Sequence, residues 1–203
     1  MTHLLSAKNL TLLRGETCLF RDQVLALDRG ELLQIEGPNG SGKTSLLRVL
    51  AGLLEPESGE VIWQGQNIRK EPQAFRAAIS WLSHRAGLKG DLTPVENLNF
   101  ESGLRASHRL SIADALERTG VSVASGLPVR SLSAGQQRRV GLARLLRSDT
   151  VLWMLDEPLT NLDTDGQQLV ESLINEHLEQ GGACIVASHQ ALGNLAVTRS
   201  VAL

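Results

Sequence analysis

Short apolar runs recur along the chain and predict a series of β-strands. Two of them, at residues 151–155 and 183–187, are apolar at every position. That pattern is typical of strands covered on both faces, as in a parallel sheet. Weaker strand patterns lie at residues 6–13, 31–36, 60–63 and 77–82.

Between these runs, apolar residues recur at helical spacing. Leucines at 46, 47, 50 and 54 predict a helix over residues 43–54. The stretch 93–146 is mostly helical in pattern, and residues 164–180 predict a helix that Gly181 and Gly182 close. Strands that alternate with helices indicate an α/β fold with a mainly parallel sheet, and the mid-chain helical block indicates an inserted lobe.

Composition narrows the classes of protein that fit. The 203 residues suit one domain, or one domain with a small lobe, and the net charge of -2 lacks the basic excess usual in nucleic-acid binders. No apolar run reaches the roughly 18 residues of a membrane-spanning helix, and no signal peptide is evident. Cys18 and Cys184 show neither zinc nor redox spacing, which favours a reducing, cytosolic compartment.

The sharpest local signal is a glycine-rich segment between a predicted strand and a predicted helix. It reads Gly37, Pro38, Asn39, Gly40, Ser41, Gly42, Lys43, Thr44 and matches G-x-x-x-x-G-K-[ST]. Glycines allow backbone N–H groups to turn toward phosphate oxygens, and the following helix adds its positive end. Lys43 suits the β- and γ-phosphates of ATP, and the Thr44 hydroxyl suits Mg²⁺.

A second signal is the acidic pair Asp156–Glu157, which follows the apolar run at 151–155. A buried strand that ends in an acid places a carboxylate at the edge where ligands bind in open α/β sheets. Beside the phosphate loop, Asp156 is expected to hold Mg²⁺ and Glu157 to act as the catalytic base toward water. Taken alone, the pair could equally be two solvated acids after a core strand.

The segment Leu132, Ser133, Ala134, Gly135, Gln136 separates this chain from other phosphate-loop proteins. By itself it reads as a serine-capped helix start. The segment lies between the phosphate loop and the acidic strand, and in that position it resembles the LSGGQ signature of ABC ATPases, with alanine in place of one glycine. Residues 161–163, ending in Asp163, resemble the D-loop of that family, and His189 occupies the switch-histidine position.

This resemblance implies a P-loop fold of the ABC ATPase type. It implies a RecA-like core at about 1–84 and 148–203, with a mainly parallel sheet and an N-terminal antiparallel β part. It also implies an inserted helical lobe at about 85–147. It also implies a nucleotide-sandwich homodimer, in which His189 contacts the γ-phosphate and the attacking water. The ATP-binding set comprises residues 37–44 with Ser45 in one copy, and Ser133, Ala134, Gly135, Gln136 and Asp163 facing it from the other.

Two positions depart from the family pattern. The usual adenine-stacking aromatic is missing, since the chain has no tyrosine, and Arg14 stands at about that place. Its planar guanidinium could stack on adenine. His84 replaces a glutamine that usually contacts the metal, so it is a candidate Mg²⁺ contact, through bound water, or a contact to a partner subunit.

With these departures the chain resembles the CcmA family of ATP-binding subunits in bacterial cytochrome c biogenesis. The resemblance implies a peripheral protein at the cytoplasmic face of the inner membrane, paired with an integral membrane subunit of the CcmB kind. Hydrolysis would then drive haem delivery or release of a haem-loaded chaperone. The expected partner surface is the groove beside His84, Leu88 and the helix that begins near Pro94. The alternatives are an exporter of another cargo and a soluble, non-transport ABC ATPase.

Overall fold

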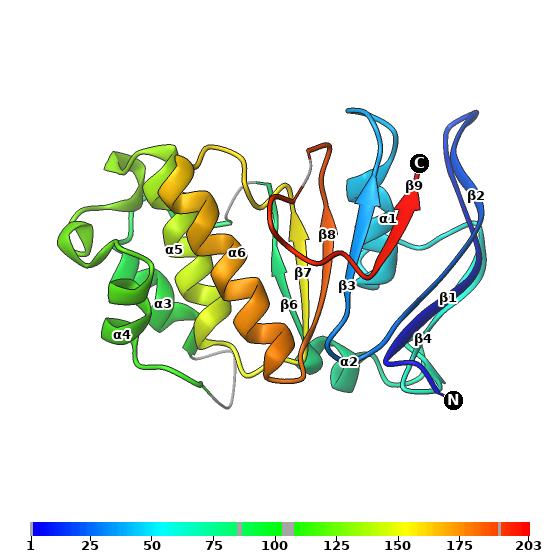
Figure 1. Cartoon of the computed structure of the whole chain (residues 1–203), viewed down its shortest axis with the longest axis horizontal. Coiled ribbons are helices and arrows are strands. Elements are labelled where there is room, and N and C mark those ends of the chain that lie inside the picture. Colours follow the sequence, from blue (N-terminus) through cyan, green and yellow to red (C-terminus); the bar gives the residue numbers. More distant parts are fainter. Residues whose placement is uncertain (1, 85–86, 103–107, 191) are drawn as a thin grey trace.

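The computed structural model describes residues 2–84, 87–102, 108–190 and 192–203 of the chain. Within these ranges the chain forms a parallel sheet, an antiparallel sheet and a group of helices. Figure 1 shows the parallel sheet in the middle, the antiparallel strands on the right and most helices on the left. This arrangement confirms the predicted fold class.

The parallel sheet has the strand order β6-β7-β8-β3-β9. Every neighbouring pair in it runs parallel, and Asp156 at the end of one central strand lies opposite Ala187 at the end of the next. Residues that follow these two positions therefore leave the same edge of the sheet side by side. The strands are β3 (Leu32–Glu36), β6 (Ile79–Leu82), β7 (Leu152–Asp156), β8 (Ala183–Ala187) and β9 (Arg199–Ala202).

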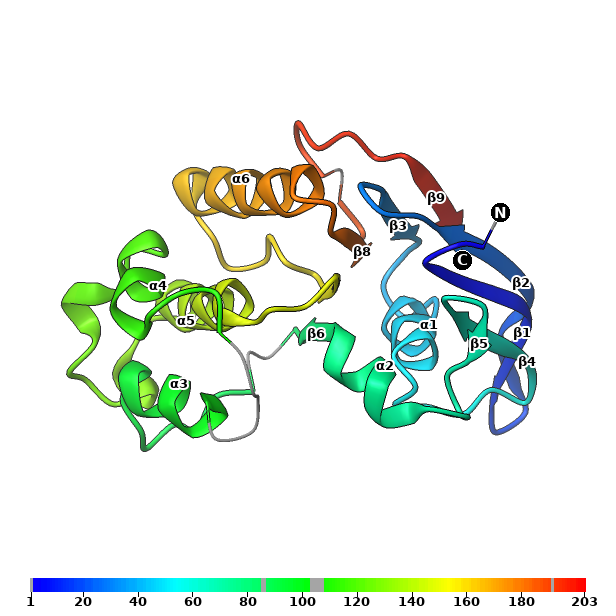
Figure 2. The ribbon, with the colours of Figure 1, turned by 90° about the horizontal axis from the view of Figure 1, so that it is seen from below.

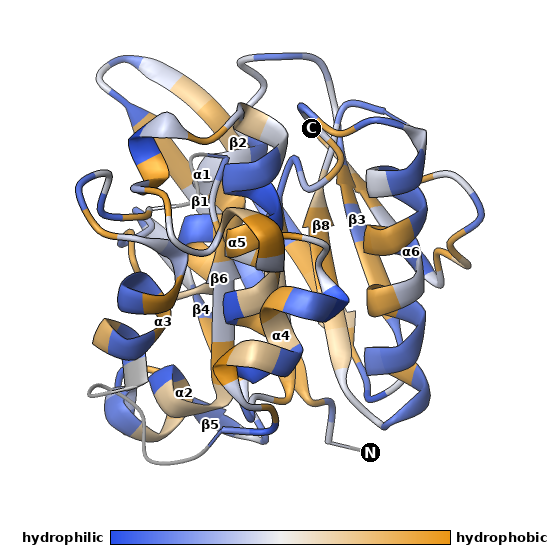
Figure 3. Ribbon diagram, turned by 90° about the vertical axis from the view of Figure 1, so that its left-hand side faces the viewer, coloured by the Kyte–Doolittle hydropathy of each residue, from blue (hydrophilic) through white to orange (hydrophobic). Residues whose placement is uncertain are grey.

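Helices cover both faces of this sheet, which explains its continuous apolar runs. Leu152 and Met154 of β7 pack in the cluster that holds α1 (Lys43–Leu50), whereas Trp153 and Leu155 pack with α5 (Ala134–Arg147) and α6 (Thr164–Glu179). Figure 2 shows α1 and α6 on opposite sides of the strands. In Figure 3, β3 and β8 are hydrophobic over much of their length.

The antiparallel sheet has the order β2-β1-β4-β5. Its long first pair has several register shifts, and Asn9 and Asp22 adopt left-handed backbone conformations there. Its inner face packs over α1 in the main apolar cluster. The strands are β1 (Leu5–Arg14), β2 (Thr17–Leu27), β4 (Ser58–Trp63) and β5 (Gln66–Asn67), and a short helix, α2 (Pro72–Ala78), leads from them into β6.

The remaining helices form a separate group with its own apolar cluster, which includes Leu98, Leu116, Val129 and Val140. Its members are α3 (Pro94–Ser102), α4 (Ile112–Arg118), the 3-10 turns η1 (Ser122–Ala124) and η2 (Val129–Ser131), and α5. In the described residues, no helix combines the length and the apolar character that crossing a membrane requires.

Several predicted boundaries differ from those observed, and two of the differences have a clear local cause. The helix predicted to reach residue 54 ends at Leu50, because the chain turns at Gly52, whose φ is +67°. The strand predicted over 77–82 begins at Ile79, because Ala77 and Ala78 complete α2.

Candidate functional site

The glycine-rich loop connects β3 to α1 and brings its residues to the first turn of that helix. Gly42 caps the helix with a φ of +108°, in the left-handed region that favours glycine. A Cβ at this position would lie 3.3 Å from the Cβ of Leu19 on β2. The loop is therefore packed beneath the antiparallel sheet and held at the positive end of α1, as an anion site requires.

Lys43 is the buried cation of this loop, with only 6% of its side chain exposed. Its Nζ donates to the carbonyl oxygens of Gly37 at 2.8 Å and Pro38 at 3.0 Å. The same Nζ lies 3.9 Å from Oε1 of Glu157. The ammonium thus stands between the loop and the acidic edge of the sheet, where it can serve a phosphate oxygen.

Asp156 ends β7 and faces the first turn of α1. The Thr44 hydroxyl donates to its carboxylate, with Oγ1 at 2.9 Å from Oδ1 and 3.0 Å from Oδ2. Burial raises the pKa of Asp156, and the Thr44 bond acts in the opposite direction. The two side chains together offer only oxygen ligands, the kind that Mg²⁺ prefers.

Glu157 and His189 meet at the same edge of the sheet, each just beyond the end of its strand. His189 Nδ1 lies 2.9 Å from both carboxylate oxygens of Glu157, within hydrogen-bond distance. The Glu157 backbone N–H donates to the carbonyl of Ala187 at 2.8 Å, and its φ is +50°. This left-handed turn directs the carboxylate toward both His189 and Lys43.

The signature segment begins α5 at a distance from this cluster. Ser133 forms a capping box with Gln136: Ser133 Oγ accepts from the Gln136 backbone, and the Gln136 side chain accepts from the Ser133 backbone. A Cβ on Gly135 would lie 3.1 Å from the carbonyl oxygen of Asn161. Asp163 caps α6 by accepting from the Gly166 N–H at 2.9 Å. In Figure 1 the parallel sheet separates α5 from the loop before α1.

The two departing positions are both exposed. His84 follows β6, and a positive charge there would partly oppose the burial that raises the pKa of Asp156. Arg14 ends β1 opposite Thr17, at the tip of the hairpin whose second strand packs on the phosphate loop. Arg85 lies outside the described residues.

One buried side chain at this site was not predicted. Arg138 of α5 donates to the backbone carbonyls of Asp156, Glu157 and Pro158. A signal for it is present in the sequence, because position 138 shares a helical face with the buried Leu142 and Leu145. An arginine on an apolar stripe indicates buried partners for its donors.

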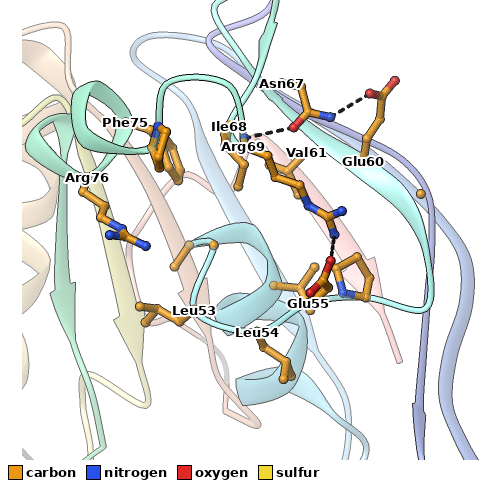
Figure 4. A pocket seen from close by; sticks show the side chains of 16 residues that line it. Leu53, Leu54, Glu55, Glu60, Val61, Asn67, Ile68, Arg69, Phe75 and Arg76 are labelled. Atoms are coloured by element: carbon orange, nitrogen blue, oxygen red, sulfur yellow. Dashed lines mark hydrogen bonds and ion pairs between the residues drawn. The ribbon is translucent and has the colours of Figure 1, made fainter.

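Another hollow, of about 440 Å³, lies between the end of α1, strands β4 and β5, and α2 (Figure 4). Its carboxylates are held by neighbours: Glu55 pairs with Arg69 at 2.9 Å, and Glu60 accepts from Asn67 at 2.9 Å. None of the residues of the phosphate-loop cluster lines it. We therefore place the candidate site at the phosphate loop.

Comparisons with known proteins agree with this placement. The sequence matches the ABC transporter family over residues 20–160. The Yersinia pestis "Cytochrome c biogenesis ATP-binding export protein CcmA" is 46% identical over 191 residues, which cover 94% of this chain and 88% of that protein. The protein of the same name from Nitrosospira multiformis is 47% identical, covering 91% and 90%.

Solved structures show the same fold. A putative ABC transporter ATP-binding protein from Pyrococcus furiosus superposes with a TM-score of 0.83 at 27% identity, covering 98% of this chain and 96% of that one. CbiO1 from Clostridium perfringens, described as part of the ABC transporter complex CbiONQ, gives a TM-score of 0.76 at 26% identity, covering 94% and 80%.

Proposed function

The chain belongs to the ABC transporter family of ATP-binding proteins, and from this premise we propose that its hydrolysis of ATP serves c-type cytochrome biogenesis. As a family member it binds ATP and is the ATPase subunit of a transporter complex. The observation that carries the assignment is 46% identity to a CcmA protein across 94% of the chain. The coupled step, in this proposal, is haem delivery or release of a haem-loaded chaperone.

We infer that Thr44 and Asp156 hold Mg²⁺ together with the nucleotide. The described residues contain no group of three or more His, Cys, Asp or Glu side chains suited to a metal. Mg²⁺ is commonly bound by one or two protein oxygens plus phosphates and water, so this sparse oxygen pair fits it. When bound, the ion would neutralise charge on the phosphate oxygens. The backbone of residues 37–45 and Lys43 would hold those phosphates.

Glu157 is the proposed base, and His189 the residue that orients it. A carboxylate fixed by one imidazole and lying 3.9 Å from Lys43 is poised to accept a proton from a water at the γ-phosphate. His189 would also contact that phosphate. Adenine would rest against Arg14, whose guanidinium plane can stack on a base.

The second half of the ATP site comes, in this proposal, from another copy of the chain. Ser133 already caps α5, so the free N–H groups of that helix start can face an anion. Ser133, Ala134, Gly135 and Gln136, followed by Asp163, would close over the nucleotide of the partner copy. The core at about 1–84 and 148–203 and the lobe at about 85–147 would then meet across the dimer interface.

The complex would also contain an integral membrane subunit of the CcmB kind, placing this chain at the cytoplasmic face of the inner membrane. The proposed contact surface includes His84, Leu88 and the start of α3. A hollow of about 480 Å³ there is bounded by His84, Leu88 and the signature helix. Charge reversal at Lys89 together with Arg85 should weaken co-purification of the membrane subunit; unchanged co-purification would remove this surface from the proposal.

Complementation tests the cargo. The chain, expressed in a bacterium that lacks its own CcmA protein, should restore haem-stained c-type cytochromes, and Lys43→Ala should not. Phosphate release by the purified chain, without restoration, would favour an exporter of another cargo.

A further inference from the structure

Arg138 makes four hydrogen bonds to backbone carbonyls, and all four acceptors lie near the site. Nη1 donates to Ser83 at 2.6 Å and Nε to Pro158 at 3.2 Å. Nη2 donates to Asp156 at 3.0 Å and to Glu157 at 2.8 Å. Arg138, on the α5 helix that begins with the signature segment, thus connects the end of β7 to the segment that follows β6.

This guanidinium is buried, with 4% of the residue exposed. Burial lowers the pKa of Arg138 to about 10, so the group stays charged at neutral pH. Among the described residues, no carboxylate forms an ion pair with it, although Asp156 and Glu157 favour its charge from further away. The buried charge is therefore stabilised by directed hydrogen bonds to carbonyl oxygens. An apolar side chain of similar size would fill this space without the free-energy cost of removing a charge from water.

The three carbonyls at the end of β7 belong to an unusual turn. Glu157 has a φ of +50°, which a non-glycine residue adopts only when its surroundings hold it there. Arg138 fixes the peptide groups before and after Glu157, and that conformation brings the carboxylate within 2.9 Å of His189 Nδ1. Without the guanidinium of Arg138, fewer hydrogen bonds would hold this turn, and the Glu157 carboxylate would be less restrained in its direction.

The fourth acceptor, the Ser83 carbonyl, belongs to a different segment from the other three. Ser83 directly precedes His84, and Arg138 lies five residues after Ser133 on the same helix run. A rotation of α5 would therefore move the turn at Glu157 and the segment before His84 together, because Arg138 is hydrogen-bonded to both. The fork geometry suits this task, because its donors leave a rigid plane in fixed directions.

We propose that Arg138 is a positioning residue for hydrolysis, which holds the Glu157 carboxylate in its working orientation and ties that orientation to the position of the signature helix. This inference rests on the proposed role of Glu157 as base. Arg138 itself touches neither nucleotide nor water in the proposal. Its effect is therefore expected in kcat and not in nucleotide affinity.

The first test is Arg138→Lys, which keeps the charge but cannot span the four carbonyls. We expect kcat for ATP to fall by about 10- to 100-fold while KM changes by less than about 3-fold. The control is Arg144→Lys on the same helix, whose guanidinium donates to the Trp81 carbonyl at 3.0 Å, away from Glu157. That control should change the melting temperature and leave kcat within about 2-fold.

A double-mutant cycle distinguishes positioning from general loosening of the fold. In a Glu157→Gln background, Arg138→Lys should cost no further residual hydrolysis, because the group that it positions is already gone. An equal loss in both backgrounds, or a normal kcat in the single variant, would overturn the proposal. Full turnover by Glu157→Gln would instead contradict the proposed base, so the two failures can be told apart.

Arg138→Gln provides a second variant, which removes the need to bury a charge and keeps two N–H donors. We expect the same split between kcat and KM from it. A Gln variant with wild-type kcat would contradict the proposal even if the Lys variant does not fold.

Discussion

His189 Nδ1 lies 2.9 Å from each carboxylate oxygen of Glu157, and the two residues follow neighbouring parallel strands. The contact depends on register, since Asp156 and Ala187 are opposite one another at the ends of β7 and β8. A hydrogen bond of this kind restrains the carboxylate, as a correctly placed base toward water requires.

Glu157→Gln should lower ATP hydrolysis by about 10³-fold while nucleotide still binds, because the amide cannot accept a proton. ATP should then remain bound, and gel filtration with ATP should show more dimer than for the unmodified chain. His189→Ala should lower kcat by a smaller factor, since the base remains but loses its restraint. Turnover near the wild-type rate in the Gln variant would exclude Glu157 as the base.

Lys43→Ala should weaken ATP binding by about 100-fold, because it removes a buried charge-assisted hydrogen bond to phosphate. Calorimetric or fluorescence titration would measure the change. Lys70→Ala is the control, since Lys70 is an exposed lysine on the loop before α2. Equal affinities for the two variants would contradict the proposed phosphate contact.

Thr44→Ala should raise the Mg²⁺ concentration needed for half-maximal hydrolysis by about 10-fold or more, since one of the two proposed oxygen ligands is lost. Thr44→Ser keeps the hydroxyl and should stay near wild type. The pair separates a metal role from a packing role, because both variants lose the threonine methyl. A magnesium requirement that is the same in both would count against the assignment.

Shared sites can be tested by mixing two inactive variants. Lys43→Ala damages the phosphate loop, and Ser133→Asp keeps a helix-capping oxygen while placing a negative charge against phosphate. In a head-to-tail dimer of one copy each, one site has an intact loop and an intact signature. Random mixing should thus restore about a quarter of wild-type hydrolysis, since half the dimers are mixed and half their sites are intact. No recovery would contradict sites shared between copies.

Acid should destabilise the fold through His177. This side chain is buried against Trp153, with ring centroids 4.0 Å apart, and burial lowers its pKa to about 4. The folded protein binds the proton more weakly than the unfolded chain, so stability is fully present above about pH 6.5 and is lost as pH falls toward 4. The loss should amount to about 3 kcal/mol.

Denaturant titrations at several pH values would measure this loss. His177→Phe keeps an aromatic ring on Trp153 but cannot be protonated, so its stability should vary less between pH 6.5 and 4. An equal pH dependence in the variant and the wild type would show that other groups cause it.

The sequence predicted the strands that carry site residues better than the edge strands and short helices around them. Ala183–Ala187 is apolar at every position because both faces of β8 are covered, and its predicted bounds match those observed. Strands β2 and β9 were not predicted individually. β2 pairs with β1 through several register shifts, and β9 is a four-residue edge strand with three exposed positions, so neither shows regular alternation. Helix α2 has one buried side chain, Phe75, and hence no periodic signal.

For the site, motifs predicted which residues gather but not how they touch. Thr44 and Asp156 were both assigned to metal, and the structure adds the direct hydrogen bond between them. The left-handed backbone of Glu157 and the four acceptors of Arg138 depend on packing between segments far apart in the sequence. No local pattern encodes such contacts, since each needs the lobes to be assembled first.

The close approach of Gly135 to the Asn161 carbonyl has a consequence for how two ATP molecules communicate. In the proposed dimer, Gly135 faces one nucleotide, whereas the loop holding Asn161 begins at the Glu157 that serves the other. A Cβ on Gly135 would lie 3.1 Å from the Asn161 carbonyl oxygen, so the start of α5 packs closely on this loop. A shift of the signature helix around one nucleotide would then reach, within a single chain, the loop that serves the other nucleotide.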